Sequence, residues 1–244
     1  MALTTEFSRR GPLDRKLAEA GAIFDTQARA AVALEFGDRG AELEAARHLG
    51  LADLSVLPRT GFKGAGAPAW LTEQGLVLPK ESNQATRQNG GEVAARLAPN
   101  EVLILGCLAG MKGSLPETLE ASWAALPLPP AAPRGYPLPR RDSHGWFLVS
   151  GAQAPAMFAK LCGVDLSPGK FDDLAIAQTS IAGVSGIIIR DDRGEQLAYH
   201  LLCDSAFAIY LWDCLIDAMT EFNGRPVGLA AVRSLGNQSS GSDP

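Results

Sequence analysis

The residues of this chain that could do chemistry are few, and one group of them follows a predicted strand. Gly106 and Gly110 frame a short stretch that leads to Lys112. A glycine-rich loop binds phosphate through its backbone N–H groups when four residues separate its glycines and Gly-Lys-Ser/Thr follows. Here three residues intervene, Met111 separates glycine from lysine, and Gly113 stands where the hydroxyl belongs. The stretch therefore does not predict a nucleotide site.

Histidine, cysteine and carboxylate side chains are the other groups that could form a site. The three histidines, His48, His144 and His200, are far apart in the sequence. No pair has the spacing of zinc ligands, and no cysteine is close enough to complete a set. His144 is either a binding residue at a domain joint or a polar residue that begins the next strand, and we favour the second interpretation. We expect no catalytic and no metal-ligating residue, and the sequence identifies no cofactor-binding residue.

The composition argues against several classes of protein. The chain has 244 residues, of which 46% are hydrophobic and 20% are charged, as in an ordinary globular protein. Its formal net charge is −5 and its basic residues form no stripe, so we expect no nucleic-acid partner. No run approaches the roughly 20 apolar residues of a membrane span, and the N-terminus lacks a signal-peptide core. The four cysteines are far apart in apolar surroundings, which favours free thiols and a cytoplasmic location.

A repeated pattern organises the elements that must position these residues. The sequence GAGAPA at Gly64–Ala69 is echoed by GAQAPA at Gly151–Ala156. In both copies an apolar stretch precedes the first glycine and an apolar helix-like segment follows the proline. Two repeated supersecondary units indicate a protein built from two similar α/β halves. We therefore expect Gly64 and Gly151 to have the same local structure.

The boundary between the halves is placed at a run of prolines. Six prolines lie between residues 127 and 139, a density that neither a helix nor a central strand tolerates. The predicted organisation is a flexible N-terminus at 1–13, a first α/β half at 14–126, a proline-rich connector at 127–140, a second α/β half at 141–233 and a disordered tail at 234–244. The order strand–helix–strand–strand–helix in each half predicts an α+β fold. We expect two pseudo-repeated ferredoxin-like halves, with helices packed on antiparallel sheets.

The predicted helix at Phe207–Phe222 is unusually apolar. Its polar positions form one narrow stripe of Asp213, Asp217, Thr220 and Glu221. Its apolar positions cover an arc of roughly 220°, about twice the stripe of a helix packed on one sheet. The helix is either sunk in its own domain or covered by a partner subunit. On the second interpretation Trp212, Ile216 and Met219 lie at a partner interface with Trp212 as the anchor, and Trp212 or its neighbours Ile216 and Met219 should be exposed in the free chain.

Several segments carry a resemblance to a known family. The most recognisable are RDSHGWF at Arg141–Phe147, AKLCGVDL at Ala159–Leu166, AQTSIA at Ala177–Ala182 and YLWDCLIDA at Tyr210–Ala218. The chain resembles the gamma subunit of heterotetrameric sarcosine oxidase and its relatives, over roughly Leu49 to Val232. More distantly, its two-half layout is similar to the folate-binding domain of the glycine-cleavage aminomethyltransferase. We can assign no matching segment to the stretch up to His48, so its role is open.

The resemblance implies a non-catalytic subunit of a complex that oxidatively demethylates sarcosine or another N-methylated amine. In that family FAD, FMN, NAD and tetrahydrofolate are bound by the larger subunits, so the resemblance implies no cofactor in this chain. The implied partners are the larger flavoprotein subunits, alpha and beta, and a further small subunit of a hetero-oligomer.

Two other functions remain open at this point. One is a stand-alone tetrahydrofolate-binding enzyme of the aminomethyltransferase type. That family has an acidic residue in an Asn-Asp pair after the first-half helix, where this chain reads Glu73-Gln74-Gly75. Asp165 is the nearest alternative acid, although it could instead cap a turn before Pro168. The other function is an assembly or regulatory factor that uses the same fold as an interaction module.

Overall fold

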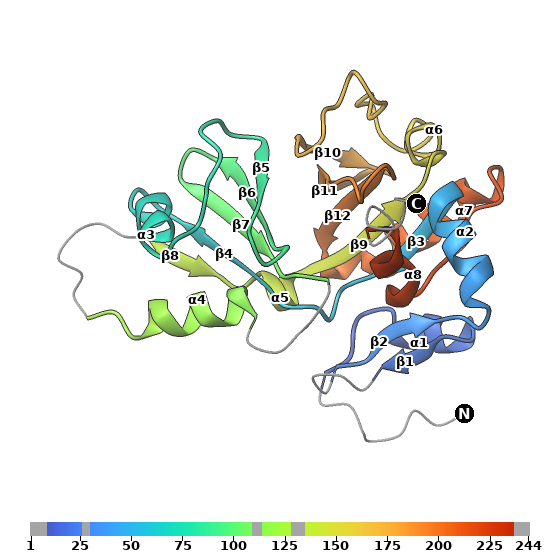
Figure 1. The fold of residues 1–244 in the computed structure, drawn as a ribbon, viewed down its shortest axis with the longest axis horizontal. Coiled ribbons are helices and arrows are strands. Elements are labelled where there is room, and N and C mark those ends of the chain that lie inside the picture. Colours follow the sequence, from blue (N-terminus) through green and yellow to red (C-terminus); the bar gives the residue numbers. More distant parts are fainter. Residues whose placement is uncertain (1–8, 26–29, 109–113, 128–134, 237–244) are drawn as a thin grey trace, which may run out of the picture. The chain divides into compact units, whose positions relative to one another are not determined.

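The computed structural model of this chain describes residues 9–25, 30–108, 114–127 and 135–236 (Figure 1). It confirms an α+β protein in which helices and mostly antiparallel sheets combine. The chain divides into two compact units. Unit 1 comprises Met1–Val56, His144–Asp173 and Ala177–Pro244, and unit 2 comprises Leu57–Ser143 and Leu174–Ile176.

Unit 1 is built on a six-stranded sheet with the strand order β10-β11-β12-β9-β3-β13. The strands are β3 (Gly50–Asp53), β9 (His144–Ser150), β10 (Ile176–Ile181), β11 (Val184–Arg190), β12 (Ala198–Asp204) and β13 (Arg225–Pro226). Strand β12 pairs antiparallel with β11 and β9, and β9 pairs antiparallel with β3. Six of the seven residues of β9 and of β12 are buried, so both faces of the sheet centre are covered.

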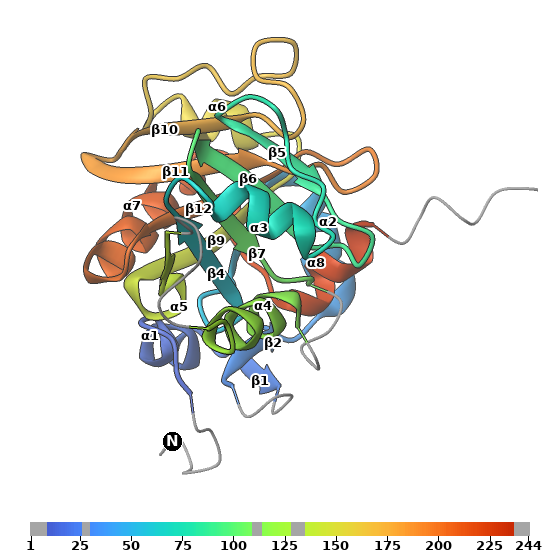
Figure 2. The same cartoon turned by 90° about the vertical axis from the view of Figure 1, so that its left-hand side faces the viewer.

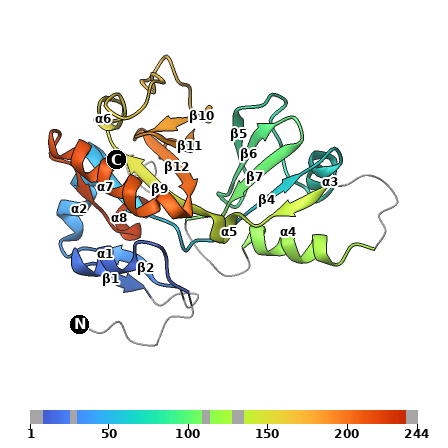
Figure 3. The ribbon, with the colours of Figure 1, turned by 180° about the vertical axis from the view of Figure 1, so that it is seen from behind.

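The remaining elements of unit 1 are mostly helices. They are α1 (Asp14–Glu19), β1 (Ile23–Asp25), β2 (Val32–Glu35), α2 (Arg39–Leu49), α6 (Ala154–Phe158), the 3-10 turn η2 (Ser205–Phe207), α7 (Ala208–Thr220) and α8 (Leu229–Leu235). Helix α2 begins where Asp38 accepts hydrogen bonds from the amides of Gly40 and Ala41, which otherwise have no helical partner. The Asp204 carboxylate caps η2 in the same way, through the Ala206 amide at 2.8 Å. Helix α7 then lies against the sheet (Figure 3).

Unit 2 is built on a five-stranded antiparallel sheet with the order β5-β6-β7-β4-β8. Its elements are β4 (Arg59–Lys63), α3 (Ala67–Glu73), β5 (Gln84–Arg87), β6 (Val93–Ala98), β7 (Glu101–Leu105), α4 (Leu115–Ala124), β8 (Tyr136–Leu138) and α5 (Arg140–Ser143). The sequence patterns did not predict β5 and β6, which carry arginine, glutamine and alanine in place of a strongly apolar run.

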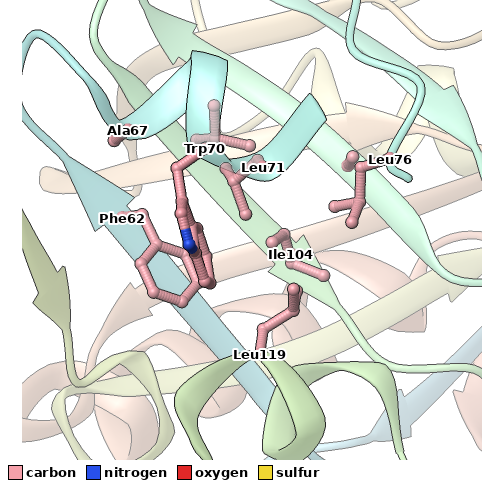
Figure 4. Packing of buried hydrophobic residues seen from close by; sticks show 9 residues of the cluster. Phe62, Ala67, Trp70, Leu71, Leu76, Ile104 and Leu119 are labelled. Carbon is pink, nitrogen blue, oxygen red and sulfur yellow. The ribbon is translucent and has the colours of Figure 1, made fainter. Parts of the chain in front are cut away.

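Aromatic rings hold the core of unit 2 together. Figure 4 shows Phe62 of β4 beside Trp70 of α3, with Ile104 of β7 and Leu119 of α4 in the same cluster. The ring centroids of Phe62 and Trp70 are 5.1 Å apart, and Trp123 of α4 lies 5.1 Å from the first and 4.7 Å from the second. Tilted and edge-on pairs at these distances stabilise a core beyond their buried area. Helices α3 and α4 are thereby fixed to the sheet.

The two glycines that open the repeated sequence have the same local structure, as predicted. Gly64 follows β4 and Gly151 follows β9, with φ angles of +124° and +107° that favour glycine. The Gly64 amide donates to the carbonyl of Asn100, just before β7, and the Gly151 amide donates to Leu197, just before β12, at 2.8 Å in both cases. Each glycine then leads into a short helix whose second residue is proline.

The equivalence extends through both sheets. In each half, the strand and short helix are followed by three consecutive strands, β5-β6-β7 or β10-β11-β12, and then by a longer helix, α4 or α7. The equivalent strands also follow one another in the same order across the two sheets. The duplication is therefore visible in the topology. The name ferredoxin-like for each half stays a prediction, because each half has one strand more than the expected order.

The compact units do not follow the predicted division at residues 127–140. Strand β3 of the first half pairs with β9, so that Leu51 lies opposite Val149. Strand β8, inside the predicted connector, pairs with β4, so that Gly61 lies opposite Leu138. The strand that precedes each repeat therefore completes the sheet of the other half. The halves are repeats in the sequence, but they are not the compact units.

The proline-rich connector is also more structured than predicted. Residues 128–134 lie outside the described part of the chain, but the residues after them form β8 and α5. Pro137 of β8 lies opposite Phe62 of β4, and β8 is an edge strand. An edge strand needs no N–H on its outer side, so proline is tolerated there.

Both predicted flexible ends need correction where the structure describes them. Residues 1–8 and 237–244 lie outside the described part of the chain. Within the predicted N-terminal lead-in, however, Leu13 is fully buried and Arg9 pairs with Ala30 in an isolated β-bridge. At the other end, Leu235 belongs to α8 and is buried. The burial of these two leucines orders both segments. The sequence did not predict this, because a single leucine in a polar stretch produces no periodic pattern.

Candidate partner interface

Helix α7 buries two of the three residues predicted at a partner interface. Trp212 is 5% exposed and its ring lies edge-on to Phe147 of β9, with centroids 5.7 Å apart. Met219 is fully buried, and the chain turns back over it where the Gly224 amide donates to the Met219 carbonyl. The predicted exposure is therefore not found at Trp212, the expected anchor, or at Met219. The sheet and the following turn cover them, whereas Ile216 is only half-buried.

The exposed apolar side chains lie at the start of α7. Phe207 is 48% exposed, Ile209 is 47% exposed and Tyr210 is 51% exposed. Ile209 and Tyr210 share the exposed face of the helix with Asp213 and Asp217. The helical pattern correctly predicted more apolar surface than one sheet covers, but it could not say which edge of the arc is left uncovered. That depends on which residues the sheet contacts.

Helix α1 lies beside this exposed face, as an ion pair between Lys16 and Asp213 shows, and α1 lies below α7 in Figure 2. The ammonium of Lys16 binds a carboxylate oxygen of Asp213 at 2.7 Å. Between the two helices is a groove of about 690 Å³, which we call the α1–α7 groove. Its side chains include Arg10, Asp14, Arg15, Lys16 and Glu19 from the N-terminal segment and Ile209 from α7. The N-terminal segment thus forms one wall of a surface hollow.

A second hollow, of about 400 Å³, lies at one end of the unit 1 sheet. Its polar lining residues are His144, Gln178, Thr179, Ser185 and Asp204, and Leu202 and Cys203 contribute the sheet surface. His144 is the first residue of β9 and pairs with Asp204 of β12. His144 therefore begins the strand, as expected, and also faces a hollow.

His200 lies in a buried hydrogen-bonded chain that the sequence did not reveal. Nε1 of Trp146 donates to Nδ1 of His200 at 3.1 Å, and Nε2 of His200 lies 3.0 Å from a carboxylate oxygen of Asp191. Arg193 binds the same oxygen at 2.5 Å. Because Nδ1 accepts, the neutral ring carries its proton on Nε2 and donates it to Asp191. His200 and Asp191 are each 1% exposed, so the arrangement orders the core and offers no surface to a substrate.

The residues weighed for a folate-dependent reaction lie in ordinary structural positions. Asp165 accepts hydrogen bonds from the amide of Ser167 at 3.0 Å and from its hydroxyl at 2.5 Å. The Ser167 hydroxyl is also the main reason that the pKa of Asp165 is lowered. Asp165 thus caps the turn before Pro168, one of the two interpretations of the sequence. Glu73 is exposed at the end of α3.

The described part of the chain shows no arrangement of side chains suited to metal binding or to thiol chemistry. No group of three or more His, Cys, Asp or Glu side chains there could hold a metal ion. None of the four cysteines, all of which the structure describes, forms a disulfide, and burial raises the pKa of Cys203 to about 11, so its thiol keeps its proton at neutral pH. The glycine stretch that ends at Gly113 lies partly in residues 109–113, outside the described part. Among the helices that are described, none has the length and apolar content that crossing a membrane requires.

Known proteins are similar to this chain in sequence and in fold. Sarcosine oxidase subunit gamma from Corynebacterium sp. (strain P-1) is 26% identical over 209 residues, which cover 84% of this chain and 97% of that protein. This chain is similar to a sarcosine oxidase gamma subunit. The resemblance inferred from the sequence is thereby confirmed. The family model described as the GCVT N-terminal domain matches residues 139–238.

Two solved structures have the same fold. A chain of the heterotetrameric sarcosine oxidase from Corynebacterium sp. U-96, in complex with pyrrole 2-carboxylate, matches with a TM-score of 0.60 and 22% identity. The match covers 78% of this chain and 95% of that chain. Glycine cleavage system aminomethyltransferase T from Bartonella henselae matches with a TM-score of 0.68 and 19% identity, over 93% of this chain but only 61% of that chain. At these identities the structures establish the fold alone.

Proposed function

We propose that this chain is a non-catalytic, gamma-type subunit of a sarcosine oxidase-like hetero-oligomer that oxidatively demethylates an N-methylated amine. The observation that carries the proposal is the share of each known protein's length that this chain matches. The match extends over 97% of a sarcosine oxidase gamma subunit and 95% of a chain of the heterotetrameric enzyme, but over 61% of the aminomethyltransferase. The chain thus has the extent of the small oxidase subunit.

The surface of unit 1 supports a role in an assembly. Phe207, Ile209 and Tyr210 expose about half of their surface on neighbouring positions, and apolar side chains gathered in this way are typical of partner interfaces. Ile216, half-buried on the same helix, is a further proposed contact. The partners would be larger alpha and beta flavoprotein subunits and a further small subunit. FAD, FMN, NAD and tetrahydrofolate would be bound by those subunits, in the cytoplasm, where free thiols stay reduced.

A stand-alone tetrahydrofolate-binding enzyme is the second candidate function. The fold likeness to the aminomethyltransferase, with a TM-score of 0.68, favours it. Against it, Asp165 uses its carboxylate to cap a turn, and Glu73 is exposed at a helix end. The two functions differ in what the isolated chain can do. An enzyme of this type binds tetrahydrofolate by itself, whereas a gamma-type subunit does not, because its larger partners would hold the folate.

The test is co-expression of the tagged chain with the flavoprotein subunits encoded in its own genome. We expect the purified complex to show flavin absorbance and to oxidise sarcosine or a related N-methylated amine. The tagged chain expressed alone is the control, and it should show neither property. Retention of no flavoprotein by the tagged chain would contradict the proposal. Tetrahydrofolate binding by the isolated chain, measured by calorimetry, would favour the second candidate instead.

A further inference from the structure

We propose that Asn89 is a modification site, where the chain deamidates spontaneously to aspartate and isoaspartate, and that the fold protects Asn223 from the same reaction. Asparagine is followed by glycine at these two positions only. Both asparagines are exposed, so solvent reaches either side chain. What differs between them is the backbone amide of the glycine that follows. The inference is independent of the proposed function, because it needs this chain alone.

The reaction joins the side chain of an asparagine to the backbone nitrogen of the next residue. That nitrogen loses its proton to water or hydroxide and attacks the side-chain carbonyl carbon, so that a C–N bond forms and the side-chain nitrogen leaves as ammonia. Water then opens the cyclic imide at one carbonyl group or the other, which gives aspartate or isoaspartate. No electrons are exchanged, and water is the only co-reactant. Glycine favours the attack, because it has no Cβ to obstruct its nitrogen and its backbone reaches many conformations.

Asn89 and Gly90 occupy the tip of the hairpin between β5 and β6. The hydrogen bonds that close this turn come from their neighbours, because the Gln88 amide donates to Glu92 at 2.8 Å and the Gly91 amide donates to Gln88 at 3.0 Å. Among the described residues, neither the Gly90 amide nor the Asn89 side chain has a hydrogen-bond partner. Both residues are exposed, and exposed loop tips open at little cost in free energy. The two reacting groups are therefore free to meet.

Asn223 and Gly224 follow the C-terminal end of α7, where the equivalent nitrogen is held in place. The Gly224 amide donates to the Met219 carbonyl at 3.0 Å. The Asn223 amide donates to the Thr220 carbonyl at 3.2 Å. Gly224 is also closely packed, because a Cβ built on it would lie 2.7 Å from Leu49 and 2.8 Å from Met219. A hydrogen-bonded nitrogen resists the loss of its proton, so the helix end must open before Asn223 reacts.

The modification would change the hairpin in two ways. Either product adds a carboxylate beside that of Glu92, which lies over Gly90, since a Cβ built on Gly90 would be 2.6 Å from Oε2 of Glu92. Isoaspartate also adds a methylene group to the backbone, which lengthens the turn next to the pair Arg87 and Val93. Turn length fixes the register of a hairpin, so β5 and β6 pair less well afterwards. Aged molecules of this protein therefore lose stability in unit 2.

The experiment incubates the purified full chain at neutral pH and follows both sites by mass spectrometry of tryptic peptides. Peptides 88–96 and 194–233 each contain a single asparagine, so the gain in mass identifies the site that reacted. We expect Asn89 to react at least about tenfold faster than Asn223, a ratio that corresponds to about 1.4 kcal/mol for opening the helix end. Incubation in urea is the control, because both glycine amides are then exposed and the two rates should converge.

Two variants identify the reacting groups. Asn89→Gln should abolish the product in peptide 88–96, because glutamine would have to close a larger ring. Gly90→Ala should slow the reaction, and its methyl group would meet only the flexible end of Glu92. Equal rates at Asn89 and Asn223 in the folded protein, or no product at Asn89, would overturn the inference. Aged wild-type protein should also unfold at a lower urea concentration than aged Asn89→Gln, and equal midpoints would overturn the stated loss of stability.

Discussion

The indole N–H of Trp146 donates to Nδ1 of His200 over 3.1 Å, and the two rings lie 5.5 Å apart between neighbouring strands. Trp146 lies in β9 and His200 in β12, so this bond ties together the two central strands of the unit 1 sheet. It also selects the ring tautomer that can donate to Asp191.

Replacing Trp146 with phenylalanine should therefore cost more than lost volume. The buried Nδ1 of His200 loses its donor, which costs about 1–3 kcal/mol in the free energy of unfolding. Trp70→Phe is the matched control, because Trp70 is equally embedded in the core of unit 2 and its indole nitrogen has no hydrogen bond among the described residues. Urea denaturation of both variants makes the comparison. Equal losses would show that the Trp146–His200 bond contributes nothing.

Trp212→Ala should destabilise the isolated chain by about 3–5 kcal/mol, because it empties a site beneath α7 that contacts Phe147. Ile209→Ala, on the exposed face of the same helix, should change stability by no more than about 0.5 kcal/mol. Thermal unfolding followed by circular dichroism distinguishes the two. A stable Trp212→Ala chain that fails only to bind its partner would restore the original interface prediction for this residue.

The contrast between these two residues marks how far the sequence alone can lead. Apolar periodicity predicted the helix and its excess of apolar surface, because both follow from residue order. It could not predict that Trp212 is inside and Ile209 outside, since that choice depends on strands and a turn distant in the sequence. In the same way, the glycines of the repeat were predictable from local pattern. The pairing of β3 with β9 was not, because nothing local to Leu51 identifies Val149 as its neighbour.

Gly151→Ala should be strongly destabilising, because two costs add. A methyl group there would lie 2.5 Å from the carbonyl carbon and oxygen of His48, and the backbone φ is +107°. Gly169→Ala isolates the second cost, since its φ is +85° and nothing lies within 4 Å of the added carbon. The strained backbone costs about 1–3 kcal/mol at either position. Chemical denaturation should show a larger loss for Gly151→Ala, and equal losses would mean that the His48 backbone moves aside freely.

Stability should fall in strongly alkaline solution because of Tyr199. Burial raises the pKa of this phenol to about 12, and its hydroxyl donates to the Leu166 carbonyl at 2.8 Å. In the unfolded chain tyrosine titrates near pH 10. Between roughly pH 10 and pH 12 the unfolded chain loses a proton that the folded protein keeps. The free energy of unfolding therefore decreases by up to about 1.4 kcal/mol per pH unit, whereas below pH 10 the full stability is present.

Tyr199→Phe should flatten this part of the pH profile, measured by urea denaturation at each pH. Tyr136→Phe is the control, because Tyr136 is 51% exposed, and it should leave the slope as it is. Burial also raises the pKa of Cys203 to about 11, so a residual slope from that thiol remains in every variant. An unchanged slope in Tyr199→Phe would contradict the prediction.

The pairing of β3 with β9 also constrains the order in which the protein can be made. Strand β3 leaves the ribosome well before β9, and all of the continuous segment Leu57–Ser143 is synthesised between them. Most of unit 2 is thus available to fold while β3 still lacks its neighbour, and the unit 1 sheet can close only after the last third of the chain emerges. A nascent chain halted after Ser143 would carry β3 as an unpaired edge, a known template for aggregation. Early termination of translation is consequently more hazardous for this protein than for one built from two successive domains.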